Sequence, residues 1–156
     1  MLSTTQAGNG AFKWLASNTP VANVAAAGGG GGQATSVLPP NTISVASPVT
    51  LVNKVQLNVD VTVTCGPFAV LSSSSANVTV TEASGHVVSQ ALGQIPALTC
   101  DGSPHTYALS LIADNAPFRP GKAVASSSAF AFGIVTPLSP LVSVTGTNTQ
   151  TVAIAK

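Results

Sequence analysis

The chain has 156 residues, of which 45% are hydrophobic and only 6% charged, with a formal net charge of +1. Soluble domains usually carry about 25% charged residues, so Ser, Thr, Asn, Gln and Gly must form most of this surface. The chain has no cluster of Lys or Arg, which argues against nucleic acid as a partner, and no run near the ~20 apolar residues that cross a bilayer. A net charge near zero favours association, so we expect an oligomer whose partners are protein subunits.

Residues 1–40 differ in composition from the rest of the chain. They contain the motif A-F-K-W-L and then a run of five glycines, Gly28–Gly32. A glycine run has maximal backbone freedom, which predicts an extended glycine-rich N-terminal arm over residues 1–40 and a folded domain over 41–156. Large apolar side chains outside a folded domain usually mark an interaction site, so Phe12, Trp14 and Leu15 are the candidate partner-binding residues.

The folded domain is predicted to begin with strands. Ile43–Val52 alternates between apolar and polar residues, but Pro48 cannot donate to a ladder and predicts an edge strand or a broken one. Val55–Cys65 alternates without interruption, as expected of a central strand with one buried face. The predicted buried set is Val55, Leu57, Val59, Val61 and Val63, and the predicted exposed set is Gln56, Asn58, Thr62 and Thr64.

Further strands follow along the chain. The expected segments are Ala76–Thr81, its hairpin partner Val87–Leu92, Leu98–Cys100, Tyr107–Ala113, Lys122–Phe132, Leu141–Thr145 and, after a loop at 146–149, Thr151–Ala155. Phe118 lies in the polar connection before Lys122 and is a candidate plug for the core. Seven to nine short strands with frequent turn signals predict an all-β fold, an immunoglobulin-like antiparallel β-sandwich.

The two cysteines, Cys65 and Cys100, each close an alternating stretch with an inward side chain. They are predicted to form a disulfide, which implies an oxidising environment, although two buried thiols in a cytosolic protein would give the same pattern. The first residues lack the basic start and apolar run of a signal peptide. Either a leader has been replaced by Met1, or the protein is made in the cytosol and reaches the outside by another route, such as the release of virus particles by lysis.

Three motifs resemble the small immunoglobulin-like secreted domains of actinobacteria. They are T-C-G-P-F at 64–68, L-T-C-D-G-S-P-H at 98–105 and P-F-R-P-G-K-A at 117–123, within a resemblance that covers roughly residues 55–133. The resemblance implies an immunoglobulin-like domain without catalytic activity.

Candidate chemistry is sparse. Asp101, Ser103 and His105 contain the residue types of a catalytic triad, but their spacing is that of a turn, and His86 also lies in a turn. Asp114 and Asn115 are better explained as turn formers than as calcium ligands. Asn77 begins an N-x-T sequon inside a predicted strand. We therefore predict no catalytic residues, no metal site and no cofactor.

Together these observations predict a non-enzymatic structural or attachment subunit of an extracellular assembly. The most concrete form is a phage virion protein, in capsid decoration or the tail, that contacts its neighbours through the N-terminal arm at the virion surface. The alternative is a secreted bacterial immunoglobulin-like surface domain that binds a ligand or carbohydrate.

Overall fold

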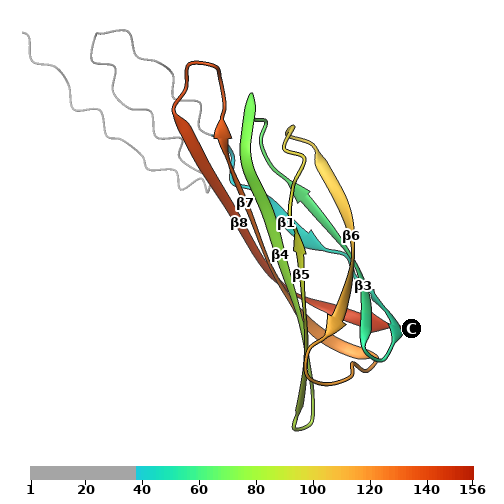
Figure 1. The fold of residues 1–156 in the computed structure, drawn as a ribbon. Coiled ribbons are helices and arrows are strands. Elements are labelled where there is room, and N and C mark those ends of the chain that lie inside the picture. Colours follow the sequence, from blue (N-terminus) through green and yellow to red (C-terminus); the bar gives the residue numbers. More distant parts are fainter. Residues whose placement is uncertain (1–37) are drawn as a thin grey trace, which may run out of the picture. The chain divides into compact units, whose positions relative to one another are not determined.

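A computed structural model describes residues 38–156, which form eight β-strands (Figure 1). The predicted arm anchors Phe12, Trp14 and Leu15 lie outside the described residues, and the domain boundary near residue 40 stays a prediction. No helix within residues 38–156 is long and apolar enough to cross a bilayer. The strands are β1 (Thr42–Val45), β2 (Val49–Asn53), β3 (Gln56–Thr64), β4 (Val70–Ser84), β5 (Val87–Ile95), β6 (Pro104–Ala113), β7 (Gly121–Ile134) and β8 (Leu141–Ala155).

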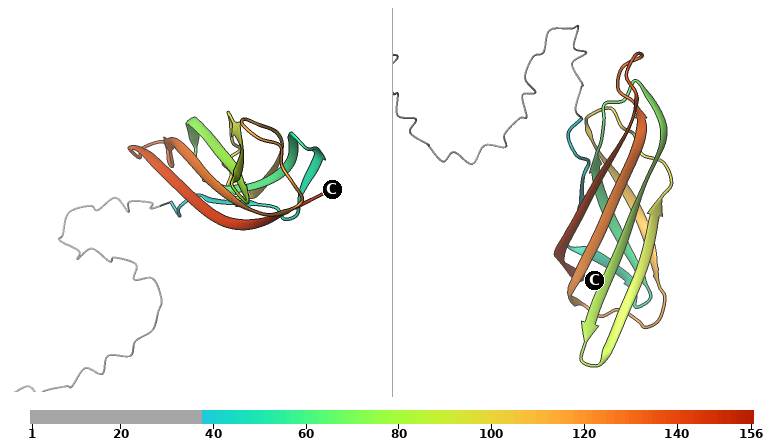
Figure 2. Two further views of the ribbon diagram at one scale, coloured as in Figure 1. Left: turned by 90° about the horizontal axis from the view of Figure 1, so that it is seen from below. Right: turned by 90° about the vertical axis from the view of Figure 1, so that its left-hand side faces the viewer.

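The strands form a single sheet that closes on itself. Their order is β1-β3-β2-β8-β7-β4-β5-β6, and β3 pairs with β6 along its whole length to complete the ring. Since β1 and β2 pair with successive halves of β3, the barrel has seven strand positions. The β2–β8 pair is parallel and the other pairs are antiparallel, so the barrel is mixed. Figure 2 (left) shows the strands arranged around a common core.

The predicted immunoglobulin-like sandwich is therefore wrong, although the all-β prediction holds. Alternation with a period of two places one face of each strand in a core, and a sandwich and a barrel satisfy that pattern equally well. The distinction depends on which strands pair at the edges. Here the long β3–β6 ladder and the short parallel β2–β8 ladder close the strands into a ring.

The barrel interior combines large side chains from one wall with small ones from the other. On β3 the buried residues are Leu57, Val59, Val61 and Val63, whereas the inward residues of β7 are all small: Ala123, Ala125, Ser127, Ala129, Ala131 and Gly133. Pairing large with small residues lets a narrow barrel fill its interior without a cavity.

The predicted register of β3 is confirmed at every position except one. Its four inward residues are at most 1% exposed, and the alternate residues are partly or fully exposed. Val55 is instead 47% exposed. It lies in the tight β2–β3 turn, where Asn53 pairs with Gln56 and Lys54 has a positive φ of 21°, so it precedes the strand rather than belonging to it.

The other predicted strands differ in their detail. The break at Pro48, the β4–β5 hairpin and the buried plug Phe118 are confirmed. Leu98–Cys100 does not resume the sheet. The predicted loop at 146–149 is also wrong, because these residues pair with Ser126–Ala129 of β7 inside one continuous strand, β8.

Gly146 explains why the sequence of β8 looks like a loop. A Cβ at this position would overlap the backbone carbonyl of Asn41, so the glycine permits a close approach between the chain before β1 and β8 rather than a turn. The Asn41 side chain also donates a 2.9 Å hydrogen bond to the carbonyl of Val144.

We expect Gly146→Ala to lower the free energy of unfolding by roughly 1–3 kcal/mol, because the backbone must move to accept the methyl group. Thr145→Ala, at the exposed neighbouring position, is the matched control and should change stability by less than about 0.5 kcal/mol. Urea denaturation followed by circular dichroism measures both. Equal stability of the two variants would show that the contact with Asn41 is not tight.

Candidate functional site

One end of the barrel is closed by the loop between β6 and β7. Phe118 lies in the core at 1% exposure, and its backbone N–H donates to the carbonyl of Lys54. The buried Glu82 carboxylate accepts the backbone N–H of Arg119 at 3.0 Å, and the Ser89 hydroxyl donates to the carbonyl of Pro117 at 2.9 Å. These contacts fix the loop as a plug, so this end offers no entry to the core.

The plug also accounts for two predicted turn residues. The side-chain oxygen of Asn115 accepts the backbone N–H of Gln90 at 3.1 Å, and the backbone N–H of Asp114 donates to the carbonyl of Gln90. Both residues therefore have a structural role beside β5. No group of three or more His, Cys, Asp or Glu side chains within residues 38–156 is arranged to hold a metal ion.

The opposite end of the barrel is held by the Cys65–Cys100 disulfide, as predicted, with 4.6 Å between the two Cα atoms. The backbone N–H of Gly102 donates to the carbonyl of Cys65 at 2.9 Å, and that of Phe68 donates to the carbonyl of Cys100 at 3.3 Å. The bond ties the end of β3 to the segment that leads into β6. A disulfide of this kind indicates an oxidising environment.

Just before Cys100, the barrel wall is interrupted. The β4–β5 ladder begins at the pair Ala76–Ile95, whereas β4 itself begins at Val70. Residues 70–75 of β4 therefore have a strand partner, β7, on one side only within the described chain. The segment Pro96–Leu98 crosses the gap without joining the sheet.

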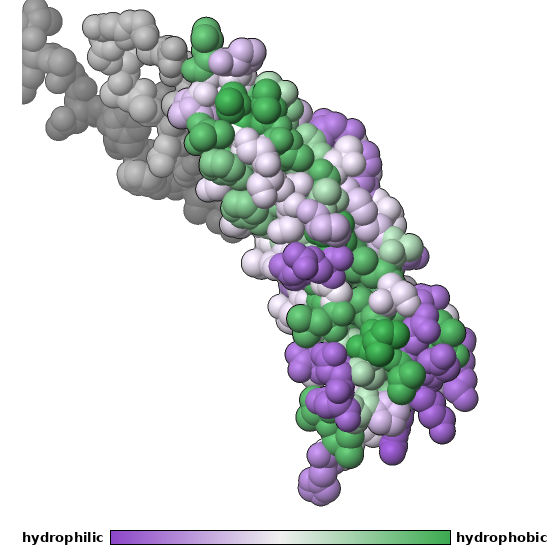
Figure 3. Space-filling model, viewed as in Figure 1, coloured by the Kyte–Doolittle hydropathy of each residue, from purple (hydrophilic) through white to green (hydrophobic). Residues whose placement is uncertain are grey.

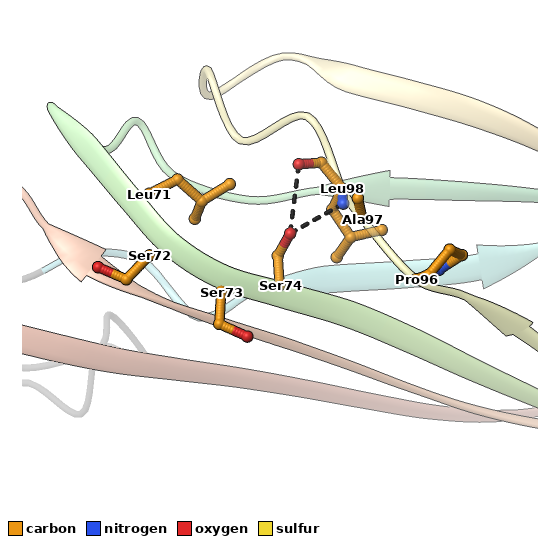
Figure 4. Close-up of a pocket in the computed structure, with 7 residues that line it drawn as sticks. All are labelled: Leu71, Ser72, Ser73, Ser74, Pro96, Ala97 and Leu98. Carbon is orange, nitrogen blue, oxygen red and sulfur yellow. Dashed lines mark hydrogen bonds between the residues drawn. The ribbon is translucent and has the colours of Figure 1, made fainter.

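A hollow of about 340 Å³ lies in this gap, between the free edge of β4 and the crossing segment (Figure 4). We call it the β4 cleft. It is lined by Leu71, Ser72, Ser73, Ser74, Pro96, Ala97 and Leu98. None of these side chains carries a charge, so the cleft suits an uncharged, extended or apolar ligand rather than acid–base chemistry.

Ser74 fixes the width of the β4 cleft. Its hydroxyl accepts the backbone N–H of Leu98 at 2.8 Å and donates to the carbonyl of the same residue at 3.3 Å, as Figure 4 shows. The Ser74 side chain therefore joins β4 to the crossing segment at a level where β4 has no ladder with β5. A bulge between Leu71 and Ser73 turns Ser74 inward, where it is 7% exposed.

Beside the cleft, on the other side of β4, the outer surface is apolar. Val70 pairs with Ile134 of β7, which pairs with Leu141 of β8, so their side chains form one row across three strands. We define the apolar end patch as Val70, Phe130, Phe132, Ile134, Leu138 and Leu141. Val70, Leu138 and Leu141 are 55%, 85% and 56% exposed. Figure 3 shows apolar surface at this end of the barrel and further apolar surface toward the opposite end.

Below the patch, the same outer surface is uncharged and rich in hydroxyl groups. The outward residues on β8 are Thr145, Thr147, Thr149 and Thr151, with Ser126 and Ser128 beside them on β7 and Asn77, Thr79 and Thr81 on β4. Asn77, the predicted sequon residue, is exposed in this row. On this face, uncharged hydroxyl and amide side chains lie in regular rows along neighbouring strands, in keeping with the small number of charged residues in the chain.

Asp101 and His105 form an ion-pair geometry at the disulfide end, with 2.9 Å between Asp101 Oδ1 and His105 Nε2. Ser103 contributes its backbone N–H to the same Asp101 oxygen at 2.8 Å. Among the described residues, no hydrogen bond joins the Ser103 hydroxyl to His105. His86 is exposed in the β4–β5 turn.

The pKa of the Asp101 carboxyl lies below its usual value of 3.8. The larger cause is the hydrogen bond from the Ser103 backbone N–H, and the second is the hydrogen bond from the His105 side chain. A depressed folded-state pKa stabilises the fold above the unfolded pKa, and that contribution is lost as the pH falls through the folded pKa. We expect His105→Ala to raise the pKa part of the way toward 3.8, since the Ser103 contact remains. A carboxyl-detected NMR titration measures this pKa, and an unchanged midpoint in the variant would contradict the assignment.

Comparisons with protein-family models, curated proteins and solved structures gave no match for this chain. The candidate site therefore stands on its own geometry. Sequence reasoning missed both the β4 cleft and the apolar end patch. The sequence does hold one signal of the patch, the alternating residues Phe130 and Phe132, which both lie on the outer face of β7.

Proposed function

We propose that this protein is a non-enzymatic structural or attachment subunit of an extracellular assembly, most concretely a phage virion protein of the capsid surface or tail. The observation that carries the proposal is the apolar end patch. Three of its large side chains are more than half exposed, and Leu138, at 85%, is the most exposed large apolar residue of the described chain. A contiguous apolar patch of this kind on a soluble domain marks an association surface.

The remaining features fit an assembly role. The β3–β6 ladder closes the sheet on itself and the disulfide ties the end of β3 to the segment before β6, which gives a rigid unit. The near-zero net charge removes long-range repulsion between copies. We take the occupant of the apolar end patch to be a second copy of the same chain, because a self-complementary apolar patch is the usual basis of a two-fold interface.

The test is the self-association of patch variants. We expect the double variant Leu138→Ser/Leu141→Ser to weaken association by about tenfold or more, because truncating each central apolar contact costs about 1 kcal/mol and about 1.4 kcal/mol is tenfold. Val87→Ser is the matched control, since Val87 is 48% exposed at the opposite end of the barrel, beside the β4–β5 turn. Light scattering after size-exclusion chromatography measures the mass. Equal dissociation constants for all three proteins would contradict the role of the patch.

One observation favours the alternative, a secreted bacterial surface domain that binds a carbohydrate. The β4 cleft has serine residues next to apolar ones in its lining, and none of these residues is charged. Its lining residues include no aromatic ring on which a sugar could stack, so this function is the weaker of the two proposals.

A further inference from the structure

We propose that the β4 cleft is an acceptor for an extended segment from the N-terminal arm of a second copy, which adds a strand to the free edge of β4. The inference rests on the proposed assembly function and specifies its connecting element. Residues 70–75 of β4 are paired with β7 but not with β5, so one row of backbone donors and acceptors faces the cleft. Such an edge is a template for strand addition.

The lining of the cleft fits an apolar strand. Leu71 and Leu98 provide apolar contacts on its inner side, and Ala97 leaves room on its exposed side because its side chain is small. An added strand would form main-chain hydrogen bonds with the edge, which provide affinity. Its alternate side chains would contact the lining of the cleft, which provides specificity. The motif A-F-K-W-L at 11–15 supplies large apolar residues for this purpose, and Lys13 is its one charged residue.

The length and attachment of the arm allow this exchange. Thirty-seven residues precede Leu38, the first residue described, and an extended chain of that length spans up to about 120 Å. The chain enters the barrel where Asn41 packs against Gly146. Gly146 of β8 pairs with Ala129 of β7, which pairs with Ala76 of β4. Ala76 in turn pairs with Ile95 of β5, the last residue of β5 before the crossing segment that borders the cleft. The attachment point and the cleft are therefore about three strand spacings, or about 15 Å, apart.

We assign the occupant to a second copy because the apolar end patch lies on the strands next to the cleft. Two copies that meet through this patch bring the arm of each close to the β4 edge of the other. Reciprocal exchange fills both clefts and gives a closed two-fold assembly without leaving an acceptor free.

The experiment uses the full-length chain and its single tryptophan, Trp14, as an internal reporter. Ala97→Arg places a charge and a large side chain in the cleft. Ala108→Arg, at an exposed position of β6, is the matched control. Phe12→Ser/Leu15→Ser alters the arm, keeps Trp14 and leaves every residue of the barrel unchanged. Light scattering gives the mass, the Trp14 emission maximum gives its environment, and far-ultraviolet circular dichroism checks the fold.

We expect the wild type and Ala108→Arg to form oligomers with blue-shifted Trp14 emission. Ala97→Arg and the arm variant keep the apolar end patch, so they should associate more weakly than the wild type rather than not at all, and their Trp14 emission should lie near that of the chain unfolded in urea. If Ala97→Arg keeps both its oligomeric mass and its blue-shifted emission, the cleft is not the acceptor, although the proposed assembly function survives. A monomeric wild type would overturn both proposals, and blue-shifted emission in that monomer would place the arm on its own barrel.

Discussion

Replacing Cys65 and Cys100 by alanine should lower the free energy of unfolding by about 4 kcal/mol. The two residues are 35 positions apart in the chain, and the bond constrains a loop of that length in the unfolded state. The folded end of the barrel should persist in the variant, because the backbone bonds from Gly102 to Cys65 and from Phe68 to Cys100 do not depend on the sulfur atoms.

Urea denaturation of the wild type under oxidising conditions and of the double variant measures this loss. The reduced wild type is the control and should match the variant to within about 1 kcal/mol, since both lack the cross-link while their side chains differ little in volume. A loss below about 1 kcal/mol would show that the unfolded chain is already restricted near these residues. Loss of all native circular dichroism at low temperature would instead show that the fold requires the bond.

Phe118→Ala should lower the free energy of unfolding by about 3–5 kcal/mol, the cost expected for removing a fully buried aromatic ring. The ring is 1% exposed and closes one end of the barrel. Its removal also loosens the loop whose backbone bonds to Glu82 and Ser89 hold the plug in place. A domain of this size is usually stable by only 5–15 kcal/mol, so the variant should melt far below the wild type.

Phe130→Ala is the matched control for Phe118→Ala because Phe130 is 37% exposed on the outer face of β7. In the monomer, this substitution should cost about 1 kcal/mol or less, as is usual for a surface position. Thermal melts at low protein concentration compare the two variants. If they lose the same stability, Phe118 is not the plug that the structure indicates.

The sequence predicts the strands of this fold better than it predicts how they are joined. The alternation in β3 identifies its buried face because a shift of one residue would reverse every position. Closure of the barrel depends on pairing between residues far apart, such as Val49 with Ile154, and a local period carries no information about that pairing. Gly146 shows the same limit, since its role depends on the approach of Asn41 from 105 residues earlier in the chain.

The candidate site was less predictable than the fold. The disulfide follows from the inward phase of two cysteines, and the structure confirms it. The β4 cleft arises because β4 extends six residues beyond the point where its ladder with β5 begins, and Ser74 bridges the gap. A serine-rich run such as Ser72–Ser75 is typical of a loop, so neither the strand nor its free edge can be inferred from these residues alone.

Self-association of this protein as a structural subunit is tested by sedimentation velocity of the purified full-length chain over a micromolar concentration series. We expect a species whose mass is a multiple of 15.3 kDa and which dissociates on dilution. A single 15.3 kDa species at every concentration, from protein whose disulfide is intact, would contradict it.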